Sequence, residues 1–362
     1  MPVLHMHNDQ PIIPGDRDKP EPGLTPDSAA SYREGDVIHT APESAIAEAD
    51  VLAAERGDVI PGTSLWRDAW RRLLKNRLAV IGMIVVAIIT VASVTGPFII
   101  KQLTGLTPDY IPTDVALLRS IPPLTGPDGS FSWTHLMGTD NQGRDLLARV
   151  LQGGQISLMV GIIATLVSLI IGVSYGAVAG YLGGRLDNLM MRAVDVLYSL
   201  PYIIIVIVLL SVFRSQSARG QVLLLFVALG SVSWLTMARI VRGQVLSLKN
   251  QEFVLAARAT GVSTSRIIFR HIVPNTLGPV IVYATLTIPT VMLTEAFLSF
   301  LGFGVQPPLA SWGSLVTDGV QNIGIFPWQL IFPGVTMALT LFSLNFLGDG
   351  LRDALDPQMR KL

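Results

Sequence analysis

The chain has 362 residues, of which 50% are hydrophobic and only 14% are charged, and it carries a formal net charge of zero and no cysteine. A soluble domain has about 25% charged residues, so this composition indicates an integral membrane protein. The balanced charge excludes the global basic character of a nucleic-acid-binding protein, and the lack of cysteine excludes disulfides, thiolate metal sites and a cysteine nucleophile.

Residues 1–62 are rich in Pro, Gly, Asp, Glu and Ser, a composition that predicts a disordered tail because it buries too little apolar surface. Within the tail, Thr40 and Glu43 have the spacing of a capping box, which favours one short acidic helix over 45–55. The two histidines near the start have no further metal ligands beside them, so we predict no metal site there.

Residues 64–77 have the pattern of an amphipathic helix. Apolar side chains recur there at helical spacing among five basic ones, and such helices lie in the membrane interface with their cations at the headgroups. The basic cluster also predicts a cytosolic N-terminus. Residues 78–100 are uncharged and extend roughly 35 Å as a helix, enough to form the first membrane span.

Residues 101–151 form a long polar excursion, which we place on the outer side. This segment contains a motif of two polar triplets that lie two residues apart: Gly138, Thr139, Asp140, Gly143, Arg144 and Asp145. Asp140 is expected to cap a helix that begins near Asn141. Arg144 and Asp145 are expected to pair with neighbouring loops.

Residues 153–184 carry no charge and contain the second span, whose many small residues let helices approach closely. The third span covers 190–213, and Pro201 in its middle is expected to kink it. Asp195 lies near the inner end of this span. A carboxylate at membrane depth is a candidate functional group, and a structural pair with Arg192, one turn earlier, is the alternative.

The fourth span covers 221–240, and a polar, basic stretch at 252–274 follows it. Good helix formers precede Gly261, which can take a positive φ and so turn one helix into another. A second helical piece is predicted over 263–271, with Pro274 marking its end. Because basic loops beside membrane spans stay in the cytosol, we place this stretch on the inner side.

The fifth span covers 276–297 and the sixth covers 329–347. Glu295, near the outer end of the fifth span, is the second acid at membrane depth and the second candidate functional carboxylate. Trp312 and Trp328 lie between the two spans, where aromatic residues form a belt at the membrane surface. Six crossings leave both termini in the cytosol.

The stretch between the fourth and fifth spans resembles a motif of a known family. Leu255, Ala256 and Ala257, followed by Gly261 and Pro274, resemble the EAA loop of ABC-importer permeases, the element that docks into the cytosolic ATPase. The Glu that gives the motif its name is replaced by Leu255, so no Glu-mediated contact is assigned there, and the consequence of this change stays open.

Three further blocks resemble the peptide and nickel branch of the same permeases. The motif at 138–145 resembles the GTD-x-x-GRD signature. Residues 297–308 resemble the segment AFLSFLGLGVQPP, and residues 347–357 resemble the ending GDGLRDxLDP. Together the four blocks imply a type I ABC importer permease, the C-type subunit of a dipeptide, oligopeptide or nickel system in the cytoplasmic membrane.

The resemblance implies an all-α membrane fold of six transmembrane helices with a cytosolic coupling helix. The partners implied are a homologous second permease, two ATPase subunits at the cytosolic face and an extracytoplasmic substrate-binding protein. Contact with that protein or with substrate is then an alternative role for the motif at 138–145. The implied ATPase-coupling residues are Glu252, Leu255, Ala256, Ala257, Arg258, Gly261, Arg266 and Pro274.

ATP and Mg are assigned to the partner subunits, because this chain has no P-loop, and we expect it to bind no cofactor and to be no enzyme. A secondary transporter needs clustered ionisable residues along its path, whereas Asp195 and Glu295 are predicted near opposite faces. A membrane-embedded hydrolase needs a nucleophile, a base and an orienting group, and no histidine lies in a predicted span. The substrate stays open among peptides, nickel and other small solutes.

The predicted organisation has four parts. They are a cytosolic disordered tail at 1–62, then an interfacial helix, first span and outer loop at 63–152, the transmembrane core with its coupling loop at 153–350, and a cytosolic C-terminal tail at 351–362.

Overall fold

The computed structural model describes residues 65–355, and the regular elements there are all helices, with two isolated β-bridges between residues 125 and 145. Five helices are long and apolar enough to cross a membrane, or six if a bent pair counts as one span. The predicted all-α membrane class is therefore confirmed. The helix predicted over 45–55, the N-terminal histidines and the chain after Leu355 lie outside the described residues.

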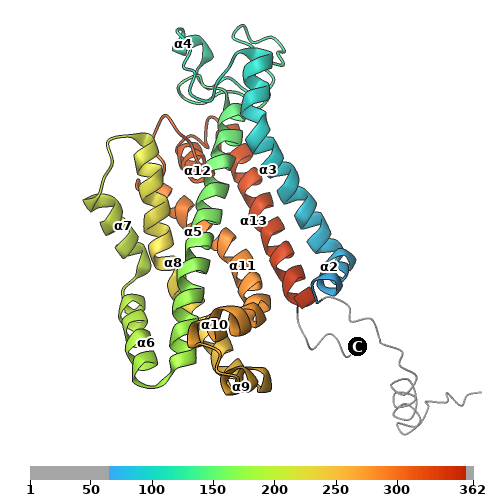
Figure 1. Ribbon diagram of the computed structural model, residues 1–362. Coiled ribbons are helices and arrows are strands. Elements are labelled where there is room, and N and C mark those ends of the chain that lie inside the picture. Colours follow the sequence, from blue (N-terminus) through green and yellow to red (C-terminus); the bar gives the residue numbers. More distant parts are fainter. Residues whose placement is uncertain (1–64, 356–362) are drawn as a thin grey trace, which may run out of the picture. The chain divides into compact units, whose positions relative to one another are not determined.

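Figure 1 labels the helices in chain order. Their bounds are α2 Leu65–Lys75, α3 Arg77–Thr104, α4 Val115–Leu118, α5 Leu146–Leu182, α6 Gly184–Ser199, α7 Tyr202–Val212, α8 Ala218–Leu248, α9 Glu252–Ala259, α10 Thr264–Arg266, the π-helix η1 Ile267–Ile272, α11 Val273–Phe300, α12 Trp312–Gln321 and α13 Trp328–Leu355.

Helix α5 lies at the centre of the bundle, where it packs along α8 and also against α3 and α11 (Figure 1). Its small residues allow this close approach, as predicted. A Cβ on Gly172 would lie 2.7 Å from the Met237 side chain, and one on Gly176 would meet the carbonyl oxygen of Ala238. Because backbone atoms cannot move away as side chains do, larger residues at these positions would push α5 and α8 apart.

The third predicted span consists of two helices and not of one kinked helix. Helix α6 ends at Ser199, α7 begins at Tyr202, and the two are bent by 80°. Leu200, directly before Pro201, has an extended backbone with φ −81° and ψ 134°. A residue before proline is pushed out of the helical region, so Pro201 breaks the span where only a kink was expected.

The helix after Gly261 does not end at Pro274, which corrects the sequence-based prediction. Helix α10, the π-helix η1 and α11 follow one another without a break, so that one continuous helical segment runs over Thr264–Phe300. Pro274 lies in the first turn of α11, directly after the π-helix η1, and the helical segment passes through it.

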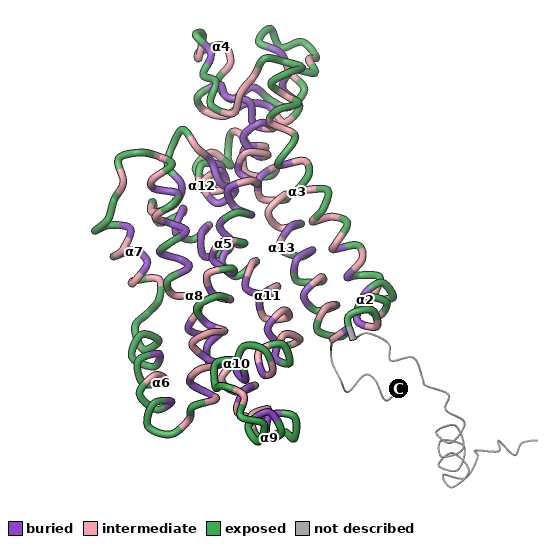
Figure 2. The backbone as a smooth tube through the Cα atoms, in the orientation of Figure 1, coloured by how far each residue is buried: buried purple, intermediate pink, exposed green. Residues whose placement is uncertain are grey.

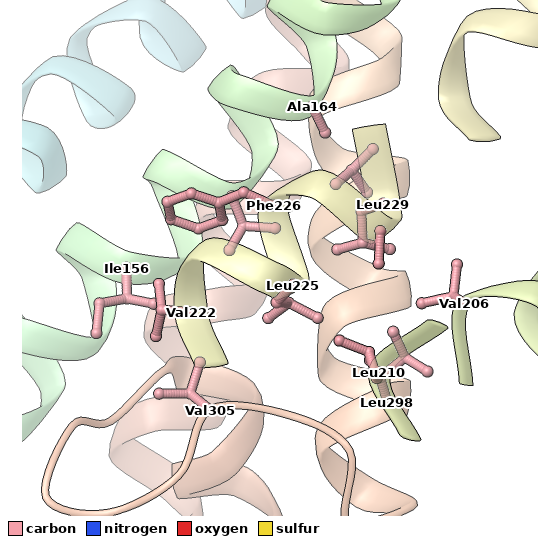
Figure 3. Packing of buried hydrophobic residues seen from close by; sticks show 13 residues of the cluster. Ile156, Ala164, Val206, Leu210, Val222, Leu225, Phe226, Leu229, Leu298 and Val305 are labelled. Carbon is pink, nitrogen blue, oxygen red and sulfur yellow. The ribbon is translucent and has the colours of Figure 1, made fainter. Parts of the chain in front are cut away.

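Two large apolar clusters hold the spans together. One joins α5, α7, α8 and α11 (Figure 3), and it includes Ile156, Val206, Leu210, Leu225, Phe226, Leu298 and Val305. The other joins the opposite ends of α5 and α8 to α9, η1 and the beginning of α11. Trp312 belongs to neither the surface nor an aromatic belt, contrary to expectation, because it is fully buried and donates its indole N–H to the Val150 carbonyl at 2.9 Å.

The outward face of α3 is apolar and exposed (Figure 2). Leu78, Ile81, Ile84 and Ile88 recur there at helical spacing, and each is at least half exposed. A contiguous exposed stripe of this kind is unfavourable in water and is typical of a helix that faces lipid.

Candidate functional site

Helix α9 is held against the bundle by its inward face. Val254 is completely buried and Ala257 is 8% exposed, and both pack in the cluster that contains Val245 of α8 and Ile267 and Ile268 of η1. An eight-residue helix is too short to be stable by itself, so this packing is what fixes α9. Ala257, predicted as a coupling residue, therefore faces the core.

The turn after α9 is a Schellman motif centred on Gly261. Gly261 has φ +75°, its N–H group donates to the Arg258 carbonyl at 3.0 Å, and the Val262 N–H group donates to the Ala257 carbonyl at 3.1 Å. This is the double hydrogen bond that ends a helix with a residue in the left-handed conformation. The predicted role of Gly261 as the residue that turns one helix into the next is confirmed.

Polar contacts tie the same segment to the end of α5. The Arg258 Nε donates to the Tyr181 hydroxyl at 3.1 Å, and its guanidinium lies 4.9 Å from the centre of the Tyr181 ring. Just before α9, the Lys249 ammonium donates to the Gly180 carbonyl at 3.3 Å. A cation beside the last carbonyls of a helix is electrostatically favourable, so both contacts stabilise the junction between α5 and the α9 segment.

The outward face of α9 is mainly apolar. Leu255 is 49% exposed and Phe253 is 40% exposed, while Glu252 and Ala256 are exposed beside them. Next to α9 lies an open groove of about 610 Å³, whose lining residues are Ser263, Ser265, Arg266, Phe269, Arg270 and Pro274. Of the predicted coupling residues, Arg266 and Pro274 line this groove, and Arg266 and Arg270 make it basic.

The motif at 138–145 is a buried ion-pair cluster. The prediction that Asp140 caps a helix is wrong, because the N-cap of α5 is Asp145. The Asp140 carboxylate accepts from the Arg144 Nε and from the Arg149 Nη1, each at 2.7 Å, and from the backbone N–H groups of Gln142 and Arg144. Arg149 is 2% exposed and was missed from the sequence. Its signal was a charged residue at the start of a long apolar run.

Asp145 is the residue that caps α5. Its Oδ1 accepts from the Ala148 N–H group at 2.8 Å, and its Oδ2 lies 3.0 Å from the His135 Nδ1. Gly143, with φ +75°, makes the turn that delays the helix start from Asn141 to Leu146. Asp145 thus pairs with a neighbouring loop residue, as expected, and acts as the cap as well.

Thr139 connects this cluster to α13. Its hydroxyl donates to the Leu118 carbonyl at 2.6 Å and accepts from the Ile121 N–H group at 2.8 Å, and its carbonyl accepts from the Gln329 side chain at 3.1 Å. Gly138 lies next to it with φ +76°, and a Cβ there would meet the Ile121 carbonyl. All six motif residues are therefore used in building the folded segment that precedes α5.

A small polar pocket of about 150 Å³ opens between this motif and α12, and Asp140, Arg144, Asp318 and Gln329 are among its lining residues. Asp318 is an exposed residue, but its carboxyl group is partly surrounded by protein, and this burial raises its pKa above the ordinary value. The positive charge of Arg144 opposes the rise in pKa, and the negative charge of Asp140 adds to it. Two acids, one cation and one amide side chain thus line this pocket.

Asp195 pairs with a residue that sequence reasoning did not select. Its carboxylate accepts from the Arg239 Nη2 of α8 at 2.7 Å, so the expected pair with Arg192 on the same helix is wrong. A second pair was missed: Asp187 accepts from the Arg242 Nε and Nη2 at 2.6 and 2.8 Å. Both pairs join α6 to α8, and the first gives Asp195 a structural partner.

Glu295 lies in a buried group of serines. It is 1% exposed, and its Oε1 accepts from the hydroxyls of Ser299 at 2.8 Å and Ser311 at 2.7 Å. Ser311 is also the N-cap of α12, and the Ser157 hydroxyl of α5 accepts from the Trp312 N–H group. Glu295 therefore connects α11 to α12 inside the fold and does not line either described pocket.

Two family models match this chain. Residues 172–361 match the model "Binding-protein-dependent transport system inner membrane component", and residues 64–123 match "N-terminal TM domain of oligopeptide transport permease C".

Individual relatives cover most of the chain. "Oligopeptide transport system permease protein OppC" of Escherichia coli K12 is 50% identical over 83% of this chain and 94% of its own. "Dipeptide transport system permease protein DppC" of Bacillus subtilis 168 is 45% identical over 83% of this chain and 88% of its own. A solved structure of the MetNI methionine ABC transporter, 18% identical, aligns with 57% of this chain and 96% of its own, with a TM-score of 0.45. The chain belongs to the family of binding-protein-dependent transport system inner membrane components, the multi-pass permease subunits of ABC transporters, which lack ATPase activity.

Proposed function

We propose that this chain forms half of the path by which an ATP-driven importer carries dipeptides or oligopeptides across the cytoplasmic membrane. The peptide substrate is supported by the relatives, which are named as oligopeptide and dipeptide permeases. A homologous second permease forms the other half of the path, and a substrate-binding protein delivers the peptide from outside.

In this proposal two ATPase subunits dock at the cytosolic face, and α9 is the docking element of this chain. The observation that carries the proposal is how α9 is attached to the membrane-spanning helices. Its inward face is buried in the bundle, Arg258 fixes it to Tyr181 of α5, and the Gly261 turn joins it to the continuous helix that becomes a membrane span. A force applied to α9 therefore acts on three spans at once.

The proposed topology places α9, α2 and both termini in the cytosol. Figure 1 shows α2 and α9 at one end of the bundle and α4 at the other. Basic residues concentrate at the first end, in α2 and around the groove beside α9, and this asymmetry favours the cytosolic side for that end.

Ala256→Asp tests the docking role. Ala256 is exposed on α9, so a carboxylate there stays solvated in the isolated chain and leaves its fold intact, but it must be desolvated when the ATPase covers this face. We expect normal insertion, poor copurification of the ATPase subunits and loss of peptide uptake. Ala256→Ser is the matched control and should retain both. Full copurification and uptake with Ala256→Asp would refute docking through this face.

A further inference from the structure

Helix α2 is fixed to the end of α13 by a narrow apolar face. Ala69 is 8% exposed and Leu73 is 2% exposed, and they pack with Ala354 of α13 and with Ala79 of α3. The approach is close: a Cβ on Gly350 of α13 would lie 3.2 Å from a Leu73 methyl group. The orientation of α2 about its own axis is therefore set by packing within the chain.

This packing leaves an apolar stripe uncovered. Trp66, Trp70 and Leu74 recur every four residues along α2, and they are 51%, 54% and 47% exposed. Two indole rings this exposed on one short helix are unusual on a surface that faces only water, and Trp prefers the boundary between headgroups and hydrocarbon. The exposed apolar face of α3 begins at Leu78, only a few residues further along the chain. The exposed stripe of α2 thus directly precedes, along the chain, the helix whose outward face is apolar and exposed.

A second stripe lies directly beside the first. Arg67, Arg71 and Lys75 each follow one apolar stripe residue by a single position, and all three are exposed. On a helix, residues four apart lie above one another on one face, so the three cations form a row parallel to the tryptophans. With Arg72, α2 holds four basic residues against one acidic residue, Asp68.

We propose that α2 binds anionic phospholipid headgroups, with Trp66, Trp70 and Leu74 inserted at the membrane surface and Arg67, Arg71 and Lys75 contacting the phosphates. The charge of the row selects this occupant over zwitterionic lipid, since each Lys or Arg near an anionic surface strengthens binding to that surface about fivefold. The proposal depends on the proposed function only for its leaflet, which is the cytosolic one in that topology. Bound lipid would hold α2, and through Leu73 the end of α13, at a fixed depth.

Quenching of tryptophan fluorescence by brominated lipids tests this binding with the full chain in nanodiscs. At equal mole fraction in a phosphatidylcholine background, brominated phosphatidylglycerol should quench more than brominated phosphatidylcholine, and high salt should reduce the excess. Trp66→Phe/Trp70→Phe should remove the excess, which assigns it to α2. Equal quenching of the unaltered chain by the two lipids would overturn the proposal without any variant.

The cations are tested by Arg67→Gln/Arg71→Gln/Lys75→Gln. This variant should be quenched normally in discs made only of brominated phosphatidylcholine, because the apolar stripe is intact, yet lose the phosphatidylglycerol excess. The matched control neutralises three exposed cations elsewhere, Lys101→Gln/Arg214→Gln/Arg219→Gln, and should keep the excess. If the triple variant keeps the excess, the row does not bind the headgroups.

Discussion

Gly261→Val isolates the contribution of one backbone conformation to coupling. Gly261 has φ +75°, and a Cβ built on it meets no atom within 4 Å. The Cβ therefore creates no clash, and the left-handed backbone costs about 1–2 kcal/mol for an L-residue and more for a β-branched one. A cost of that size changes the ratio of turned to straightened α9 by about 5- to 30-fold.

The expected result of Gly261→Val is a chain that inserts normally, copurifies poorly with the ATPase subunits and transports slowly. Straightening the turn would break the hydrogen bonds from Gly261 to Arg258 and from Val262 to Ala257, so hydrogen exchange at residue 262 should accelerate before any partner is added. Uptake and copurification then report the loss of coupling.

A graded series makes the reasoning on residue 261 refutable. Asn adopts the left-handed conformation far more readily than other non-glycine residues, so Gly261→Asn should stay close to normal, Gly261→Ala should be intermediate, and Gly261→Val should be worst. If Asn and Val give the same uptake, or if Val leaves exchange at Val262 unchanged, the strain argument and the coupling role of this turn are both wrong.

Three further perturbations test other parts of the structure. Asp140→Asn should lower the free energy of unfolding of the purified chain by about 3–5 kcal/mol, because it leaves the buried charge of Arg149 uncompensated. The melting temperature should fall, and an unchanged melting curve would contradict this prediction. Since burial raises the pKa of Asp318, its ionised form is disfavoured in the folded state, so Asp318→Asn should stabilise the fold at neutral pH, and the gain should vanish as the pH falls below about 4. Cysteines introduced at the exposed residues Ser263 and Ser130 should react with an impermeant reagent from opposite sides of the membrane; labelling from one side would refute the topology.

The spans were predictable because each depends on a local property, an uncharged apolar run of sufficient length. The turn at Gly261 was predictable for a similar reason, since glycine is the residue that takes positive φ without cost. Pro274 misled because a proline can end one helix or begin another with the same sequence, and only the packing of η1 and α11 against the bundle decides between them.

The ion pairs were poorly predictable because their partners come from distant segments. Arg192 was the near neighbour of Asp195, but its partner is Arg239 on α8, which is separated from α6 by the whole of α7. Asp140 had the composition of a cap, and the turn at Gly143 transferred that role to Asp145. A sequence shows which residues are able to cap or pair, whereas chain geometry selects which of them do so.

The uninterrupted helical segment Thr264–Phe300 has a mechanical consequence. At the α-helical rise its 37 residues would extend about 55 Å, but the π-helix η1 shortens this length, and Pro279 and Pro289 inside α11 are points where the segment can bend. One end adjoins α9, and near the other end Glu295 is bonded to the Ser311 that begins α12. Under the proposed docking role of α9, a displacement of α9 would reach α12 through this helical segment and the hydrogen bond between Ser311 and Glu295.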